Sequence, residues 1–83
     1  MQFFVYILYS ASLDKYYVGH THDLQDRLMR HNNKGSLSTK AGPPWVLKYT
    51  EGFLSKAEAA NRELEIKRKK SRKYLEFLIS SAG

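Results

Sequence analysis

The chain of 83 residues, with 42% hydrophobic and 27% charged side chains, has the composition of one small folded domain over residues 1–83. It has no cysteine, which excludes a disulfide scaffold, a cysteine-ligated zinc site and a thiol nucleophile. A domain this small without disulfides favours an intracellular, cytoplasmic location. The longest apolar run, Phe3 to Tyr9, is far shorter than the roughly 20 residues that span a bilayer, so we expect no membrane partner.

The net charge of +6 is concentrated in the last third of the chain, where residues 55–83 carry eight basic and four acidic side chains. Six of the seven residues from Lys67 to Lys73 are basic. Such a run is either a solvated helix end or a surface that contacts a phosphate backbone. The second interpretation predicts eight nucleic-acid-binding residues: Lys34, Lys40, Lys67, Arg68, Lys69, Lys70, Arg72 and Lys73.

Three segments have the pattern of β-strands. Phe3 to Tyr9 is rich in aromatic and β-branched residues and predicts a strand that is buried on both faces. Tyr16 to Gly19 predicts a short second strand that pairs with the first in a hairpin. Trp45 to Thr50 alternates in hydropathy and predicts a third strand that is covered on one face. The alternation places three side chains on that covered face: Trp45, Leu47 and Tyr49.

Helices are predicted on either side of the third strand. The first runs to about Asn33, after one of two candidate N-caps, Thr21 and Asp23. A capping pattern at Ser55 starts the next helix, which runs to about Lys70, and Ser71 caps a third. The order is β-β-α-β-α-α, which predicts an α+β fold with a small three-stranded antiparallel sheet flanked by helices.

Polar side chains interrupt the apolar pattern of two of these helices. Arg27 and His31 are one helical turn apart at the edge of the core-facing stripe. Either both side chains face a cleft, or Arg27 extends to water and His31 is a half-buried histidine whose hydrogen bonds are satisfied within the core. Glu63 lies within a stripe of small apolar residues. A carboxylate there either serves a site or pairs with Lys67 in water.

The chain is also rich in tyrosine, with six tyrosines in 83 residues. Tyr6 and Tyr17 lie on the two strands of the predicted hairpin, so their hydroxyls either converge on one point or only pack in the core. Hydrolysis of a phosphodiester requires charge stabilisation on the phosphate and a deprotonated nucleophile. Tyr6 would act as the base only if its pKa, near 10 when free, were lowered.

Two short tyrosine motifs in the hairpin, and the residues that follow them, resemble the GIY-YIG nuclease superfamily. Val5-Tyr6-Ile7 and Tyr17-Val18-Gly19 resemble its two half-motifs, with ten residues between the tyrosines. The first predicted helix continues the pattern with four residues: Thr21, Leu24, Arg27 and His31. Glu63, within residues 59–67, resembles the family's metal-binding glutamate. The resemblance extends from about residue 3 to residue 79, and small stand-alone bacterial members are the most similar.

The resemblance implies a GIY-YIG fold and metal-dependent cleavage of phosphodiester bonds. In its terms Tyr6 is the general base or assists it, while Tyr17 and Arg27 organise the phosphate and the nucleophile. His31 belongs to the site in some members, and Glu63 is the protein side chain that holds Mg²⁺ or Mn²⁺.

The chain departs from the family pattern at a few positions. Phe4 replaces the first glycine, and Val5 and Val18 replace isoleucines, all on strand backbone. Several members carry an asparagine about three helical turns after the glutamate, where this chain reads Tyr74-Leu75-Glu76. The leading hypothesis is a metal-dependent endonuclease that acts on DNA rather than RNA, with single-stranded, branched or end structures as candidate substrates.

Two other functions are compatible with the sequence. A nucleic-acid-binding module without catalysis would use the basic segment 67–73 and the lysines of the loop before the third strand. An interaction domain would instead direct the basic segment at an acidic protein, although no protein partner is evident in the sequence. The sequence does not fix an oligomeric state.

Overall fold

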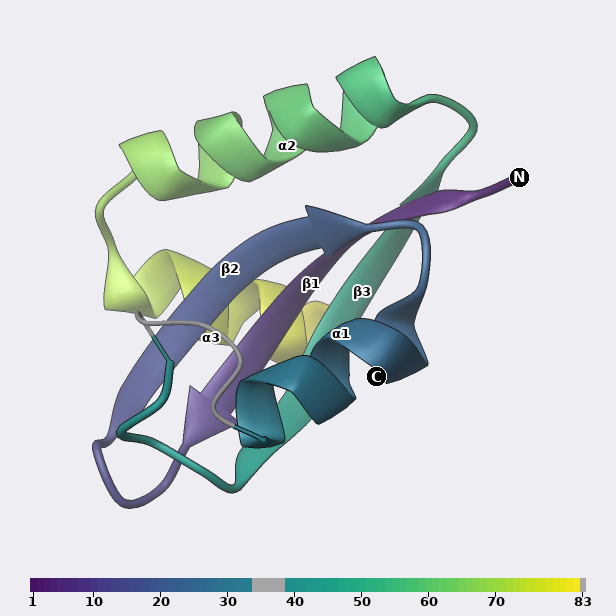
Figure 1. Cartoon of the computed structure of the whole chain (residues 1–83). Helices are drawn as coiled ribbons and strands as arrows, with labels where there is room; N and C mark the ends of the chain where they lie inside the picture. Colours follow the sequence, from purple (N-terminus) through teal and green to yellow (C-terminus); the bar gives the residue numbers. More distant parts are fainter. Residues whose placement is uncertain (34–38, 83) are drawn as a thin grey trace.

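The computed structural model describes residues 1–33 and 39–82. Within them the chain forms the six predicted elements in the predicted order (Figure 1). Their bounds are β1 Phe3–Ser10, β2 Lys15–Thr21, α1 Leu24–Asn32, β3 Trp45–Phe53, α2 Lys56–Arg68 and α3 Arg72–Ser81. No helix in these ranges is long and apolar enough to cross a bilayer.

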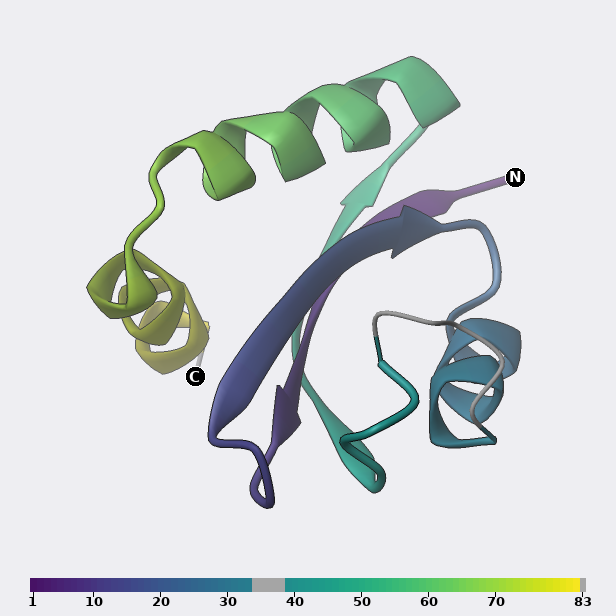
Figure 2. The same ribbon diagram turned by 60° about the vertical axis from the view of Figure 1, so that its left-hand side comes forward.

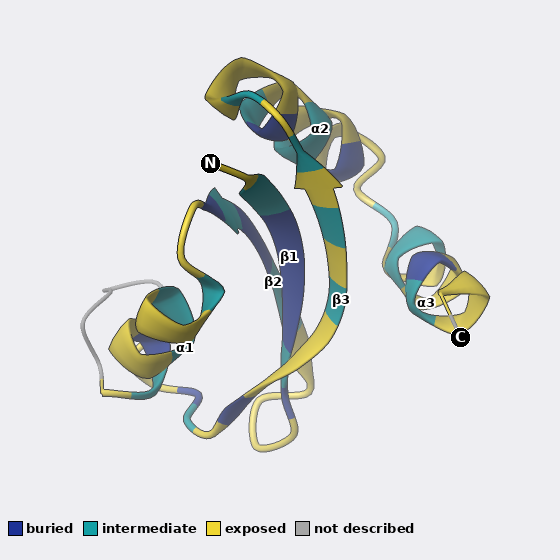
Figure 3. Cartoon of the chain, turned by 90° about the vertical axis from the view of Figure 1, so that its right-hand side faces the viewer, coloured by how far each residue is buried: buried dark blue, intermediate teal, exposed yellow. Residues whose placement is uncertain are grey.

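The three strands form one antiparallel sheet in the order β2-β1-β3, so β1 is central and β2 is an edge strand. Helix α1 covers one face, and α2 and α3 cover the other, as the side view shows (Figure 2). Because both faces of the central strand are covered, Val5 to Leu8 are at most 2% exposed (Figure 3). The expectation of a strand buried on both sides is confirmed.

Side-chain alternation along β1 divides the core into two clusters. Val5 and Ile7 point toward α2 and α3, where they pack with Val18, Ala59, Ile66 and Leu78. Tyr6 and Leu8 point toward α1 and pack with Trp45, Tyr17, Leu24 and Leu28. The side chains of α1 and those of α2 therefore lie on opposite faces of the sheet.

All three helices start at side-chain caps. Asp23 Oδ1 accepts the backbone N–H of Asp26 at 3.0 Å, which selects Asp23 over Thr21 as the cap of α1. Ser55 and Ser71 cap α2 and α3 by accepting the backbone N–H three residues on, at 3.2 and 3.1 Å. Helix α2 ends at Arg68, two residues before the predicted end, because Lys70 takes a positive φ of 47° that reverses the chain.

The third strand differs from the prediction in which of its side chains point to each face of the sheet. The register between β1 and β3 shifts after Ile7, which pairs with Tyr49, because Leu8 pairs with Leu47 and leaves Lys48 as an extra residue. A bulge of this kind reverses which side chains face which side of the sheet. Trp45 therefore packs under α1, whereas Tyr49 packs toward the other core, and the predicted common face is wrong.

Candidate active site

A buried hydrogen-bond chain joins the centre of the sheet to helix α1. The Tyr6 hydroxyl lies 3.0 Å from His31 Nε2, and His31 Nδ1 lies 2.7 Å from Thr39 Oγ1. The Trp45 indole N–H donates to the Thr39 carbonyl at 2.8 Å and holds that residue in place. The Tyr17 ring lies against the imidazole, with centroids 4.8 Å apart. Tyr6 and Tyr17 therefore both contact His31 on the α1 face.

Burial determines the protonation state of His31. Its residue is only 2% exposed, and burial, followed by the charges of Arg27 and Arg30, lowers the pKa of the imidazole below its usual value. A neutral imidazole has one donor nitrogen and one acceptor nitrogen. When Nε2 accepts a hydrogen bond from the Tyr6 hydroxyl, Nδ1 donates one to Thr39 Oγ1, so both ring nitrogens have a partner.

The lowered pKa of His31 predicts a pH dependence of stability. The unfolded chain gains a proton at His31 near pH 6.5, and the folded chain gains it only at a lower pH. The contribution of His31 is therefore complete above pH 6.5 and is lost as pH falls through the folded pKa. In urea unfolding from pH 7.5 to 5, the stability gap between wild type and His31→Gln should narrow. A constant gap would contradict a depressed pKa.

Gly19 opens the edge of the sheet to the Tyr6 hydroxyl. Tyr6 and Gly19 are paired across β1 and β2, and a Cβ at Gly19 would lie 2.5 Å from Tyr6 Oη and 3.2 Å from Tyr17 Cε1. The Tyr6 ring thus lies across the space that a side chain would fill. Because β2 is the edge strand, the phenol oxygen reaches toward the outer edge of the sheet.

We expect Gly19→Ala to destabilise the fold by about 1–3 kcal/mol, because the buried Tyr6 ring cannot give way without losing its packing. Gly52→Ala is the matched control, since the nearest neighbour of its Cβ would be the flexible end of Gln2 at 3.1 Å, with Phe4 in ordinary contact at 3.7 Å. Urea unfolding of both variants measures the difference. Equal stabilities would show that Tyr6 is not tightly held over Gly19.

Arg27 reaches the same region from helix α1. Its Nε is buried and has no hydrogen-bond partner within the described ranges. It lines a cavity of about 350 Å³ with His20 at the end of β2 and Lys56 at the start of α2. A guanidinium with an unused donor beside two basic side chains suits an anionic ligand better than a protein partner.

The surroundings of Tyr6 keep its hydroxyl protonated. Burial, and then the neighbouring Tyr17, raise the pKa of Tyr6 to about 12; Arg27 lowers it in part, and Glu63 raises it. The surrounding side chains therefore do not give Tyr6 the lowered pKa that it would need to act alone as a base. Tyr6 is therefore a neutral phenol that shares its proton with His31 Nε2.

Glu63 approaches from the opposite face of the sheet. Its carboxylate lies 2.5 Å from His20 Nδ1 and accepts from Lys67 Nζ, and its side chain is 16% exposed. Burial alone would raise the pKa of Glu63, but the bonds from Lys67 and His20 hold it below its usual value. The charge of this carboxylate raises the pKa of Tyr6, after the larger influences of burial, Tyr17 and Arg27.

The donor set around Glu63 is compatible with a divalent cation that keeps most of its water. Within the described residues, no three His, Asp or Glu side chains are grouped as metal ligands. Mg²⁺ commonly binds one or two carboxylates and completes its shell with water and phosphate oxygens. An ionised, partly exposed carboxylate fits that mode, provided that the ion displaces His20 and Lys67 from its oxygens.

The predicted nucleic-acid contacts differ in their surroundings. Lys34 lies outside the described residues, and Lys40 is exposed in the turn before β3. Arg72 is committed to Asp14 and Glu76, and Lys67 to Glu63. The remaining four side chains are exposed at the junction of α2 and α3: Arg68, Lys69, Lys70 and Lys73.

Two contact residues of the site were absent from the sequence predictions. His20 shares with Glu63 the side of the sheet that α2 covers, a placement that the alternation after Gly19 indicates. Thr39, which is fully buried against His31, lies in a segment with no periodic pattern. Only the fold brings Thr39 to its partner.

The fold and the arrangement of side chains define an α+β domain with a candidate active site beside the edge strand of its sheet. The chain belongs to the GIY-YIG family, whose sequence profile, described as the GIY-YIG catalytic domain, matches residues 2–75. Membership implies nuclease-type chemistry on a nucleic acid and the use of a divalent metal ion.

The chain is also similar to small UPF0213 proteins. It is 47% identical to one from Streptococcus pneumoniae over 64 residues, and the aligned region covers 76% of this chain and 65% of that protein. One from Halobacterium salinarum is 42% identical over 64 residues, covering 76% of this chain and 82% of that protein. The NMR structure of one from Bacillus halodurans has a TM-score of 0.62 and 37% identity, covering 100% of this chain and 87% of that one. The chain thus spans 65% of the length of the streptococcal protein.

Proposed function

We propose that this protein is a metal-dependent endonuclease that hydrolyses phosphodiester bonds in DNA, including single-stranded, branched or end structures. The observation that carries the proposal is that two sets of side chains reach the adjacent residues Gly19 and His20 of the edge strand. Tyr6 and Tyr17 lie at Gly19 on the α1 face, with His31 in contact with both, and Arg27 lines a cavity with His20. Glu63 of α2 binds His20 from the other face. Family membership supports the reaction class.

Arg27 binds and stabilises the phosphate in this proposal. Attack by water forms one P–O bond and breaks another, so negative charge builds up on the phosphoryl oxygens and on the leaving oxygen. A preorganised guanidinium stabilises that charge, because its N–H donors point toward the phosphate. The buried, unpartnered Nε and the adjoining cavity are the features that support this role.

The Tyr6–His31 pair takes up the proton of the attacking water. As the Tyr6 oxygen accepts that proton, it releases its own to His31 Nε2, 3.0 Å away. The phenol remains neutral throughout, which agrees with its raised pKa, and the imidazole supplies the basicity. Thr39 holds the far side of the ring in the required tautomer.

Glu63 would hold the divalent cation. When bound, Mg²⁺ or Mn²⁺ supplies positive charge to the phosphoryl oxygens. Displacement of Lys67 from Glu63 would free its ammonium group for the phosphate backbone.

The proposal is tested by a screen of metal ions against DNA structures. Purified protein is incubated with Mg²⁺, Mn²⁺ or a chelator on blunt duplex, single-stranded, branched and flap substrates, with RNA versions of each. We expect cleavage that requires a divalent ion and favours DNA. Activity that is unchanged by the chelator would contradict the proposal.

A nucleic-acid-binding module without catalysis is the second candidate. Both oxygens of Glu63 are engaged by His20 and Lys67, an arrangement that a stable structural ion pair would also show. This candidate predicts salt-sensitive binding with no cleavage under any metal. If excess DNA failed to displace an acidic protein bound to the basic segment, both nucleic-acid functions would be disfavoured.

A further inference from the structure

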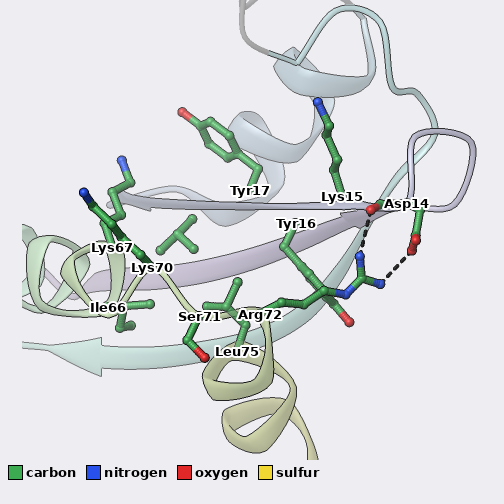
Figure 4. Close-up of a pocket in the computed structure, with 11 residues that line it drawn as sticks. Asp14, Lys15, Tyr16, Tyr17, Ile66, Lys67, Lys70, Ser71, Arg72 and Leu75 are labelled. Carbon is green, nitrogen blue, oxygen red and sulfur yellow. Dashed lines mark hydrogen bonds and ion pairs between the residues drawn. The ribbon is translucent and has the colours of Figure 1, made fainter.

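A groove of about 440 Å³ runs between the outer edge of β2 and the junction of α2 and α3 (Figure 4). The apolar side chains at its floor are Leu75 from α3, which is half-buried, and two core residues, Val18 from β2 and Ile66 from α2. Both hairpin tyrosines of β2, Tyr16 and Tyr17, border it from opposite sides of the strand. A groove with an apolar floor and bordering tyrosines is suited to a planar aromatic ligand.

Basic side chains surround this floor. Lys15, Lys67, Lys70 and Arg72 line the groove, against one acid, Asp14. Arg72 is bound to Asp14 at 2.6 Å. Lys15 and Lys70, by contrast, form no ion pair in the described parts of the chain and are exposed. The groove thus offers positive charge to a ligand that has both an apolar face and a negative group.

The groove shares two residues with the candidate active site. Tyr17 borders the groove, and its ring also lies 4.8 Å from the His31 ring. Lys67 lines the groove and also binds Glu63. A polymer whose phosphate lies at Gly19 reaches the groove when it follows the free edge of β2 toward Lys15.

We propose that this groove binds an unpaired nucleotide next to the scissile phosphate, so that the substrate is single-stranded on that side. The inference rests on the proposed function. A nucleobase in a duplex has both faces covered by its neighbours, so only an unpaired base can place a face against the apolar lining of the groove. Lys15 and Lys70 then bind the phosphates on either side of that base.

Binding is measured with wild-type protein in chelator, so that no substrate is consumed. Fluorescence anisotropy compares a blunt DNA duplex, the same duplex with a single-stranded flank, and that flank with abasic sites. We expect the flank to tighten binding about tenfold and the abasic flank to lose this gain, because stacking requires the base.

Three charge variants locate the effect. Lys15→Glu removes a groove cation, and Lys48→Glu makes the same change on β3, at the opposite edge of the sheet. Lys70→Gly also removes a cation, and glycine accepts the positive φ of 47° at this position, so the fold is preserved. We expect both groove variants to weaken binding to the flanked duplex several-fold more than Lys48→Glu does.

The outcomes separate this inference from the proposed function. Equal binding to blunt and flanked duplexes would overturn the groove, as would a gain that persists on the abasic flank. A flank preference without cleavage under any metal would support the groove and contradict the endonuclease. Metal-dependent cleavage that is as fast on the blunt duplex as on the flanked duplex would support the endonuclease and contradict the groove. Equal losses in the groove variants and in Lys48→Glu would also overturn the groove.

Discussion

Replacement of Glu63 by glutamine is expected to lower kcat at least about 10³-fold, which corresponds to roughly 4 kcal/mol of transition-state stabilisation. The amide has the size of the carboxylate but lacks the negative charge that a divalent cation requires. The fold should persist, because the contacts with His20 and Lys67 are partly exposed ion pairs that contribute little to stability. DNA affinity should also persist, since the change removes no cation.

Glu65→Gln is the matched control for this prediction. Glu65 is two residues further along α2, is exposed, and binds Arg62 rather than the site. Its substitution should leave kcat unchanged. Calorimetric titration with Mn²⁺ gives a second measurement, in which Glu63→Gln should lose binding and Glu65→Gln should keep it. Cleavage by Glu63→Gln at the wild-type rate would remove this carboxylate from the mechanism.

The helices and the hairpin were predictable because local chemistry determines them. Asp23, Ser55 and Ser71 each cap a helix, as their spacing indicates. The facing of β3 was not predictable, because the bulge at Lys48 is fixed by pairing with β1 rather than by the strand's own alternation. Register is a property of two strands, and one strand's sequence specifies it only in part.

The polar side chains of the site were identified because they interrupt apolar patterns or match family motifs. His31 and Arg27 stand out on the inner side of α1, and both prove to be inward-facing: His31 is 2% exposed, and the Nε of Arg27 is buried. Glu63 does pair with Lys67, as the simpler interpretation held, but it also binds His20 beside the edge of the sheet.

Electrostatics at the site depended on the fold. The rise in the pKa of Tyr6 follows from burial and from the neighbouring Tyr17, neither of which the sequence quantifies. The contact of Glu63 with His20 depends on the packing of α2 against β2, and the position of the Tyr6 hydroxyl depends on the absence of a side chain at Gly19. A sequence shows the glycine but not the phenol that lies across it.

Replacement of Arg27 by alanine is expected to lower kcat by about 10²–10³-fold with a much smaller change in KM. In the proposed function the guanidinium stabilises charge that develops in the transition state, so its loss affects turnover more than ground-state binding. Arg27→Lys should restore little of this activity, because an ammonium lacks the planar pair of donors that binds two phosphate oxygens. Steady-state cleavage of a flanked DNA substrate measures both constants.

Arg30→Ala is the control, since Arg30 is exposed in the last turn of the same helix. Both variants remove one positive charge from α1, so a general loss of attraction for DNA would affect them alike, through KM and its dependence on salt. A specific role of Arg27 requires that kcat fall in Arg27→Ala alone. If a folded Arg27→Ala protein cleaved at the wild-type rate, its buried Nε would be only a structural feature of the α1 core, and the phosphate would have to be bound by other side chains of the adjoining cavity, His20 and Lys56.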